Sequence, residues 1–236
     1  MSRLLPALLL CLSLLSAACA RQTYSVNTLD APALTAHRTV AIMPFDVELD
    51  RLRLRDVSYA GPNPSAEDIA RRQQQWTARQ QLERRNLGYQ LQQQLQLQLQ
   101  AQQPSRGYTV QFQDVRETNT RLLQAGITYE NLLDHSMEEL QKALGVDAVL
   151  SGQTLLYQPM PNGLNLAARV LLNESLPADM PSNTATTNLT LHDCRSGRLT
   201  WRFDYERAGS ASLNPERLSK DLVRAASPSF PYRRTE

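Results

Sequence analysis

Arg38-Thr39-Val40-Ala41-Ile42-Met43-Pro44-Phe45 is the stretch of sequence that decides the fold of this chain. It is a short apolar run, partly β-branched, that ends in Pro-Phe and is followed by the acidic, turn-prone residues Asp46 and Asp50. A run of this kind predicts a strand buried on both faces, as found in the middle of an α/β sheet. We therefore expect the rest of the chain to cover this strand.

The pattern downstream predicts an α/β (α+β) domain with a small mixed sheet and covering helices. Alternation of apolar and polar residues indicates the strands, and capping residues, glycine stops and leucine spacing indicate the helices. A turn containing Gly197 predicts a β-hairpin, which is followed by a final helix. The expected order is a helix at about 65–103, a strand at 108–114, helices at 118–125 and 136–144, a strand at 148–155, a helix at 162–175, strands at 184–192 and 198–205, and a helix at 214–226.

The long helix is rich in glutamine and is predicted to begin at Ser65, an N-cap residue with the acid Asp68 three positions later. Leucines recur every fourth residue over Leu87–Leu99 and form a stripe that suits packing on a sheet. Gly88 and the Gln-Leu alternation over 94–100 weaken the pattern, but Gln and Leu form helices better than strands. We expect the glutamine face to be solvated; the alternative is a coiled-coil or partner-docking surface.

The first twenty residues are typical of a targeting signal. Arg3 supplies a positive start, and residues 4–15 form an apolar core too short to span a bilayer. Leu15-Ser16-Ala17-Ala18-Cys19 resembles the lipobox of bacterial lipoproteins, although Ser16 departs from the usual leucine or valine. The resemblance implies that Cys19 carries lipid and becomes the mature N-terminus. The alternative is ordinary cleavage after Ala18 or Ala20.

These patterns divide the chain into four parts. Residues 1–18 are the expected signal peptide, 19–37 a lipidated tether, 38–232 a single α/β domain and 233–236 a tail. The tether is predicted to be flexible because its sequence is polar and contains Pro32. An alanine rather than an aspartate after Cys19 implies, by resemblance to Gram-negative lipoproteins, a protein at the outer membrane facing the periplasm.

The sequence has no convincing pattern of catalytic or metal-binding residues. His37, His135 and His192 lie far apart, and His192-Asp193-Cys194 lacks the spacing of a zinc site or a nucleophile with its base. The Gly-x-Ser-x-Gly motif is missing. The formal net charge is +2 and no broad basic segment occurs, which argues against nucleic-acid binding. We therefore expect a protein that is not an enzyme and that needs no cofactor or metal.

Three short motifs resemble the CsgG/LpoB superfamily of bacterial envelope lipoproteins and, more distantly, the N-terminal domain of TolB. They are Met43-Pro44-Phe45, the segment from Gly145 to Gly152, and residues 193–201 with the sequence Asp-Cys-Arg-Ser-Gly-Arg-Leu-Thr-Trp. The ending Phe230-Pro231-Tyr232 is similar to lipoproteins of Bacteroidetes-like bacteria. The resemblance implies a small domain, similar to the anticodon-binding fold, that serves as an interaction platform.

The expected function is that of a lipid-anchored periplasmic accessory protein that docks on another component of the cell envelope. Its partners would be the membrane, through the lipid on Cys19, and an envelope protein. One alternative is a subunit of a homo-oligomeric outer-membrane assembly of the curli-secretion-channel type, and another is an envelope hydrolase, which no motif supports. Trp76, Tyr89 and Trp201 are candidate docking residues because aromatic side chains dominate interface energies; burial in the core is the alternative for each.

Overall fold

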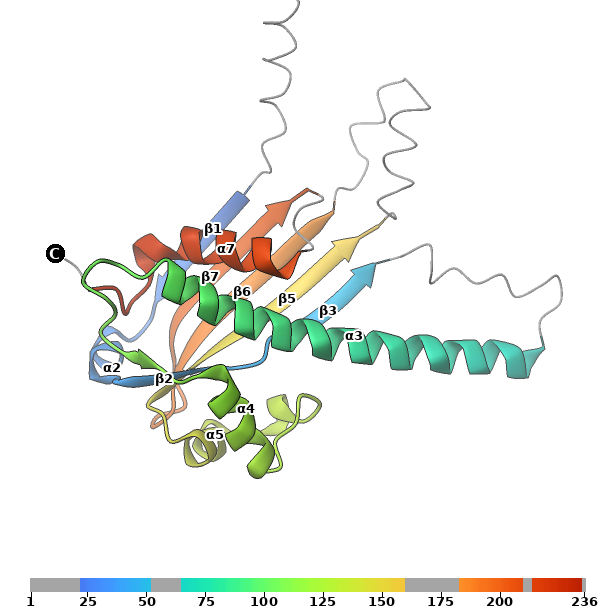
Figure 1. Cartoon of the computed structure of the whole chain (residues 1–236), viewed down its shortest axis with the longest axis horizontal. Helices are drawn as coiled ribbons and strands as arrows, with labels where there is room; N and C mark the ends of the chain where they lie inside the picture. The colour runs from blue at the N-terminus through green and yellow to red at the C-terminus, as the bar shows by residue number, and fades with distance from the viewer. Residues whose placement is uncertain (1–21, 52–64, 160–182, 210–213, 235–236) are drawn as a thin grey trace, which may run out of the picture.

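The computed structural model describes residues 22–51, 65–159, 183–209 and 214–234, which form a mixed seven-stranded sheet with helices against both faces (Figure 1). The strands lie in the order β1-β7-β6-β5-β2-β4, and β3 also pairs with β5. The pairs β1–β7, β7–β6 and β6–β5 are antiparallel, whereas β2 and β3 run parallel to β5 and β4 runs parallel to β2. The α/β class is confirmed, including the hairpin and the helix that follows it.

The elements follow one another along the chain with short 3-10 turns, labelled η, among them. They are β1 (Gln22–Thr28), α2 (Ala31–Ala36), β2 (Thr39–Ile42), β3 (Asp46–Arg51), α3 (Ala66–Ala101), β4 (Gln111–Phe112), α4 (Val115–Gln124), η2 (Leu132–Asp134), α5 (Met137–Leu144), β5 (Ala148–Gln158), β6 (Thr184–Asp193), β7 (Leu199–Ala208), α7 (Pro215–Ala226) and η4 (Ser227–Ser229).

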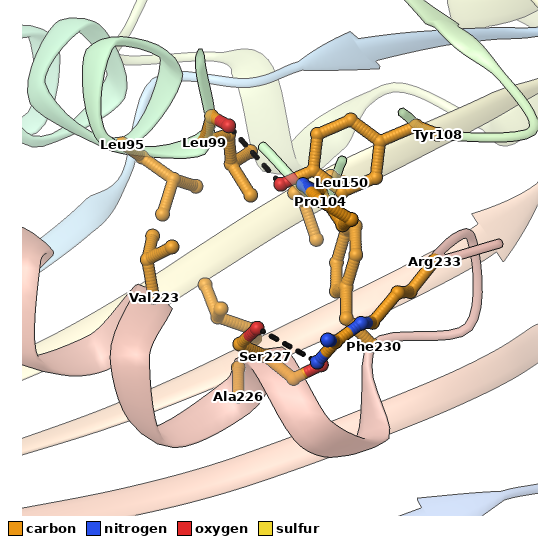
Figure 2. Close-up of a pocket in the computed structure, with 11 residues that line it drawn as sticks. Leu95, Leu99, Pro104, Tyr108, Leu150, Val223, Ala226, Ser227, Phe230 and Arg233 are labelled. Carbon is orange, nitrogen blue, oxygen red and sulfur yellow. Dashed lines mark hydrogen bonds between the residues drawn. The ribbon is translucent and has the colours of Figure 1, made fainter. Parts of the chain in front are cut away.

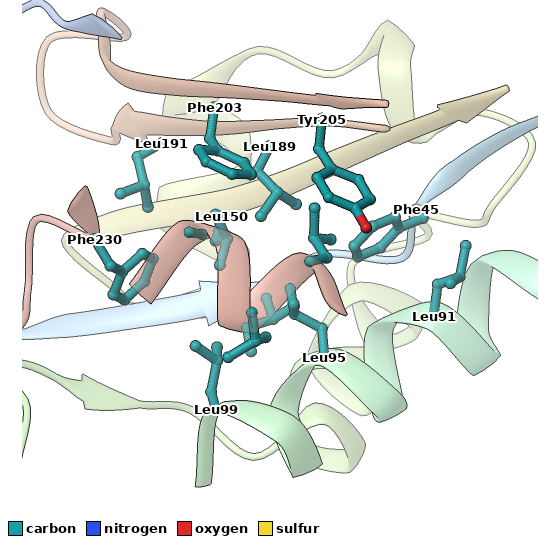
Figure 3. Close-up of a cluster of buried hydrophobic side chains, with 14 of the residues drawn as sticks. Phe45, Leu91, Leu95, Leu99, Leu150, Leu189, Leu191, Phe203, Tyr205 and Phe230 are labelled. Atoms are coloured by element: carbon teal, nitrogen blue, oxygen red, sulfur yellow. The ribbon is translucent and has the colours of Figure 1, made fainter. Parts of the chain in front are cut away.

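β2 is buried on both faces, as its sequence predicts. Val40 and Ile42 belong to the larger core, which lies between the sheet and the helices α3 and α7. Figure 3 shows this core, with leucines of α3 and the aromatic rings of β7 pointing toward one another. Ala41 belongs to a smaller core on the other face, with Leu122 of α4 and Leu144 of α5. The strand therefore joins the two layers of helices.

β3 differs from the sequence prediction, because the acidic residues after β2 favour a turn and the structure has a strand there. Ile42 lies opposite Leu150, and Asp46 lies opposite Gln153. Three residues of the β2–β3 connection therefore lie opposite two residues of β5, which makes a bulge. Pro44 lies in this bulge, where its missing N–H breaks no regular ladder. β3 then continues along β5, and its acidic residues alternate with Val47 and Leu49. Alternation with buried Val47 makes it a half-buried strand at the sheet edge.

The long helix is a single unbroken element, and its predicted N-cap is confirmed. The side chain of Ser65 accepts a hydrogen bond from the N–H of Asp68. Gly88 does not break the helix: a Cβ there would lie 2.4 Å from the carbonyl oxygen of Phe45 and 2.6 Å from the ring of Tyr129. The glycine therefore allows a close approach between α3 and the β2–β3 connection. Residues 94–100 are helical despite their alternation.

The prediction of a flexible tether is wrong for residues 22–37. β1 pairs with β7 along its whole length, and Tyr24 stacks on Phe203 with ring centroids 5.7 Å apart. Asp30 then caps α2, and Pro32 occupies the first turn of that helix, where proline is tolerated. The polar composition reflects an edge strand with most of its side chains exposed, rather than a linker.

The other predicted elements differ mainly in length. The strand expected at 108–114 is limited to β4, which contains only Gln111 and Phe112. The capping box of Ser136 with Glu139 and the left-handed Gly145 at the end of α5 are both confirmed. The predicted helix at 162–175, the signal peptide and Cys19 lie outside the described residues.

Candidate functional site

Trp201, one of the three predicted docking residues, lies in the core. Its side chain is 0% exposed and is stacked on Phe203 with ring centroids 5.9 Å apart. The ring of Phe230 meets it edge-on at 5.6 Å. The alternative role, burial, therefore describes Trp201.

Tyr89 lies at the surface, where α3 passes the loop between α4 and η2. Its side chain is 36% exposed and packs against Tyr129, with ring centroids 6.0 Å apart. Beside the two rings, Arg85 Nη1 lies 3.4 Å from Glu130 Oε1. We call these four residues the Tyr89 patch.

The Tyr89 patch is held in place from below. The N–H of Val47 donates to the hydroxyl oxygen of Tyr129 at 3.2 Å, which ties the ring to β3. Gly88, next to Tyr89, leaves room for the same ring. Burial raises the pKa of both tyrosine hydroxyls, so both stay neutral donors at physiological pH. The patch is therefore a fixed aromatic surface with one ion pair at its rim.

Trp76 lies on the part of α3 that extends beyond the sheet. Glu83 forms an ion pair with Arg51 at the end of β3, and Arg84 donates to the carbonyl oxygen of Val47. Residues 66–82 therefore continue past the end of β3, as Figure 1 shows; we call them the arm. Trp76 is 40% exposed there.

A buried polar cluster that sequence patterns did not reveal forms around His37. Its Nδ1 lies 2.7 Å from the hydroxyl of Tyr232, and its Nε2 lies 3.0 Å from Oδ1 of Asp193. The imidazole is 2% exposed. Because both ring nitrogens have partners inside the protein, the imidazole links three distant segments of the chain and presents no nitrogen to a ligand.

Asp193 also closes the turn of the hairpin. Its Oδ2 accepts hydrogen bonds from the N–H of Ser196 at 2.7 Å and from the Ser196 hydroxyl. Burial raises the pKa of Asp193, but these bonds and His37 lower it more, and the net shift is downward. Next to it, burial raises the pKa of Cys194 to about 12, so the thiol is not a nucleophile at neutral pH.

An apolar crevice lies between the C-terminal part of α3 and α7 (Figure 2). Leu95 and Leu99 face Val223 across it, and Phe230 closes one end. The hydroxyl of Tyr108 donates to the carbonyl oxygen of Leu99 at 3.1 Å. The cavity measures about 10 Å³, which is close to the space of one water molecule, so it is part of the packed core.

Within the part of the chain that the structure describes, no group of three or more His, Cys, Asp or Glu side chains could hold a metal ion. No helix in the same ranges is both long and apolar enough to cross a bilayer.

Comparison of the sequence with models of known protein families finds no match, and comparison with curated proteins finds none. Among solved structures, the fold is similar to the PelC dodecamer from Paraburkholderia phytofirmans, at 12% identity and a TM-score of 0.37, over 90% of this chain and 100% of that one. It is similar to the lipoprotein GNA1162 from Neisseria meningitidis, at 16% identity and a TM-score of 0.40, over 82% and 97% of the two chains.

The LpoB C-terminal domain from Salmonella enterica is a third similar structure, at 8% identity and a TM-score of 0.32, over 74% of this chain and 91% of that one. At these identities and scores, the likenesses indicate neither a function nor a partner for this chain. The similarity to lipoproteins of Bacteroidetes-like bacteria stays a prediction.

Proposed function

We propose that this chain is a lipid-anchored protein of the cell envelope that acts by binding another envelope protein, not by catalysis. The anchor is the lipid on Cys19, at the outer membrane and on its periplasmic side. The docking surface is the Tyr89 patch, which is the observation that supports the proposal most.

The chemistry of the patch suits a protein partner. Tyrosine and arginine are enriched among the residues that dominate binding energies. The two rings bury apolar area with few rotatable bonds, and Tyr129 is already fixed by Val47. Binding then orders little that was mobile, which favours affinity. Glu130 and Arg85 offer one charge of each sign to a partner at the rim.

The experiment that tests the proposal combines envelope fractionation with crosslinking. Tagged chain is extracted with detergent, and the mass of its N-terminal peptide reports whether Cys19 is lipidated, with Cys19→Ser as the soluble control. Crosslinked partners are then identified by mass spectrometry for wild type, Tyr89→Ala and Tyr24→Ala. Tyr24 is the matched control because it is an exposed tyrosine, 60% accessible, at the opposite edge of the sheet.

We expect wild type and Tyr24→Ala to capture the same envelope protein. Tyr89→Ala should reduce this capture about 30-fold, the effect of a hot-spot residue worth about 2 kcal/mol. Equal capture by Tyr89→Ala would contradict the docking surface. Capture of copies of the chain alone, in one uniform oligomer, would favour the alternative of a homo-oligomeric assembly. An unmodified Cys19 would contradict the anchor.

A further inference from the structure

The first or last residues of β1, β3, β5, β6 and β7 lie together at one end of the sheet. Gln22 opens β1 opposite Arg207, and the other strands are aligned with it by their register. Figure 1 shows the ends of these strands at one end of the sheet. We call these strand ends the terminal row: Gln22, Arg51, Gln158, Thr184 and Ala208.

The terminal row lies close to Cys19 in the sequence. Only three peptide steps separate Cys19 from Gln22, and an extended chain spans at most about 3.6 Å per residue. Covalent geometry alone therefore limits the distance between the sulfur of Cys19 and Gln22 to roughly 15 Å, side chain included. β1 is fixed to β7, so no long tether relaxes this limit.

The arm extends from the same end of the sheet. Glu83 meets Arg51 of the terminal row, and α3 runs back along the sheet from there, with Gly88 at Phe45 and Gln92 at Ile42. The residues before Glu83, from Ala66 to Leu82, make a helix about 25 Å long at about 1.5 Å per residue. The arm therefore extends beyond the terminal row, the end of the sheet that is nearest in sequence to Cys19.

The arm carries the side chains that suit a lipid surface. Ile69 and Trp76 are seven residues apart and therefore on one stripe, and they are 54% and 40% exposed. Tryptophan favours the boundary between headgroups and acyl chains. Arg72 and Arg79 lie four residues before and three after Trp76, which places both guanidinium groups beside this stripe. Long arginine side chains can reach phosphates while their stems stay on apolar surface.

We propose that the arm lies on the surface of the bilayer that holds Cys19, with Ile69 and Trp76 toward the acyl chains and Arg72 and Arg79 toward the phosphates of anionic lipids. This rests on the proposed anchor at Cys19. The helix then has two contact partners: the sheet covers its second half, and the headgroup layer covers its first half. A protein partner on the same stripe would be a different explanation, and the experiment separates the two.

The experiment uses the tryptophans, of which the sequence has only Trp76 and Trp201. A chain that begins at Cys19, and so keeps every described residue, is coupled through that thiol to a maleimide lipid in vesicles containing phosphatidylglycerol. Cys194→Ala removes the second thiol, and Trp201→Phe leaves Trp76 as the fluorophore. Emission is compared between ordinary vesicles and vesicles with brominated acyl chains, which quench only a tryptophan in contact with the bilayer.

We expect brominated lipid to remove about half of the Trp76 emission, and its maximum to shift to the blue, as for a residue at the membrane interface. Replacing both Arg72 and Arg79 by Gln should weaken the quenching most at low salt, because high salt already screens their attraction to the anionic lipid in the wild type. A control with Trp76→Phe and Leu123→Trp, an exposed position on α4 that is 70% accessible, should not be quenched. If Trp201→Phe perturbs folding, Trp201 is kept, and the emission of Trp76 is obtained by subtracting the emission of the Trp76→Phe protein from that of the protein with both tryptophans.

Trp76 emission that is identical on the two kinds of vesicle would overturn the proposal. A shift that occurs only after an envelope extract is added would also overturn it, in favour of a protein partner. Because the maleimide lipid replaces the natural anchor, this result does not depend on lipidation in cells. An unmodified Cys19 in the fractionation experiment would remove the proposed anchor and leave the measured property of the arm unchanged.

Discussion

The two halves of α3 differ in surroundings far more than in composition. Both are rich in glutamine, but from Glu83 to Ala101 the helix lies on the sheet, and from Ala66 to Leu82 it extends beyond β3. In the docked half, Gln92 is completely buried and donates to the carbonyl oxygen of Ile42 at 2.8 Å. In the arm, Gln73 and Gln74 are exposed.

This difference shows that glutamine in this helix is not simply a solubilising residue. The amides of Gln92 and Asn119 donate to each other's oxygen atoms at 2.9 and 3.0 Å, respectively, which joins α3 to α4. Gln96 accepts from the N–H of Val115 at 3.2 Å and so holds the start of α4. A buried amide with all of its partners specifies the register between two helices, as a leucine could not. The arm contains the same residue type without such partners in the protein core.

The largest expected effect is the contrast between two apolar truncations on the same helix. Leu95 is 1% exposed in the larger core, and Leu95→Ala should lower the free energy of unfolding by about 2–5 kcal/mol. Ile69→Ala, in the arm, should change it by no more than about 0.5 kcal/mol. Urea unfolding of the Cys19→Ser chain measures both. A loss for Ile69→Ala as large as that for Leu95→Ala would mean that the arm is packed in solution, and the division of α3 would be wrong.

The second contrast concerns glycine and alanine. In an exposed helix, alanine is about 1 kcal/mol better than glycine, so Ala78→Gly in the arm should cost at most about that amount. Gly88→Ala should also destabilise the protein, by about 1–3 kcal/mol, because its Cβ would overlap the Phe45 carbonyl oxygen. The Tyr129 ring can move aside, but the backbone oxygen moves only with the β2–β3 connection.

Urea unfolding again gives the measurement, and capture of the envelope partner gives a second one. Since the added methyl group displaces Tyr129, Gly88→Ala should weaken partner capture as Tyr89→Ala does, while Ala78→Gly leaves it unchanged. A Gly88→Ala protein more stable than wild type would show that α3 does not approach the connection this closely.

Sequence patterns predicted the elements that have strong local signals. The apolar run of β2, the Ser65 cap, the capping box of Ser136 and the hairpin turn at Gly197 each depend on residues close together in the chain, and all four are confirmed. β1 was missed because an edge strand packs only one face, so its composition resembles that of a linker. β3 is not evident from the sequence because the acidic residues Asp46 and Asp50 are typical of turns as well as of an edge strand.

The contacts that build the sites lie beyond such patterns. His37 meets Tyr232 across 195 positions and Asp193 across 156, and no local spacing indicates that they are neighbours. Among the predicted docking residues, exposure separates Trp76 and Tyr89 from Trp201, although all three are aromatic. The sequence does not indicate that Tyr129 is the neighbour of Tyr89, because their contact depends on how closely α3 approaches this loop at Gly88.

The smallest expected effect contrasts a carboxylate of the sheet with one of the arm. Asp147 Oδ2 accepts from the N–H groups of Arg38 and Thr39 at 2.8 and 2.9 Å, and so joins the start of β2 to the loop before β5. Burial raises the pKa of Asp147, but these bonds outweigh it and the net shift is downward. Asp68 also has a lowered pKa, mainly from the Ser65 hydroxyl and then from Arg71, but its side chain is 40% exposed at the tip of the arm.

A carboxyl group whose pKa is lower in the folded state stabilises the protein above its unfolded pKa of about 4, and this contribution is lost as the pH falls through the folded pKa. Asp147→Asn should therefore be less stable than wild type by about 1 kcal/mol at pH 7, because an amide oxygen accepts these bonds more weakly. The difference should shrink as the pH falls below about 4, where the carboxyl group of the unfolded chain takes up its proton, and it is lost once the pH passes below the lowered folded pKa. Asp68→Asn should leave the urea midpoint unchanged at every pH, since fraying of the arm does not open the sheet. If Asp68→Asn shifts the midpoint as much as Asp147→Asn does, the arm unfolds together with the sheet, and the two halves of α3 form one cooperative unit.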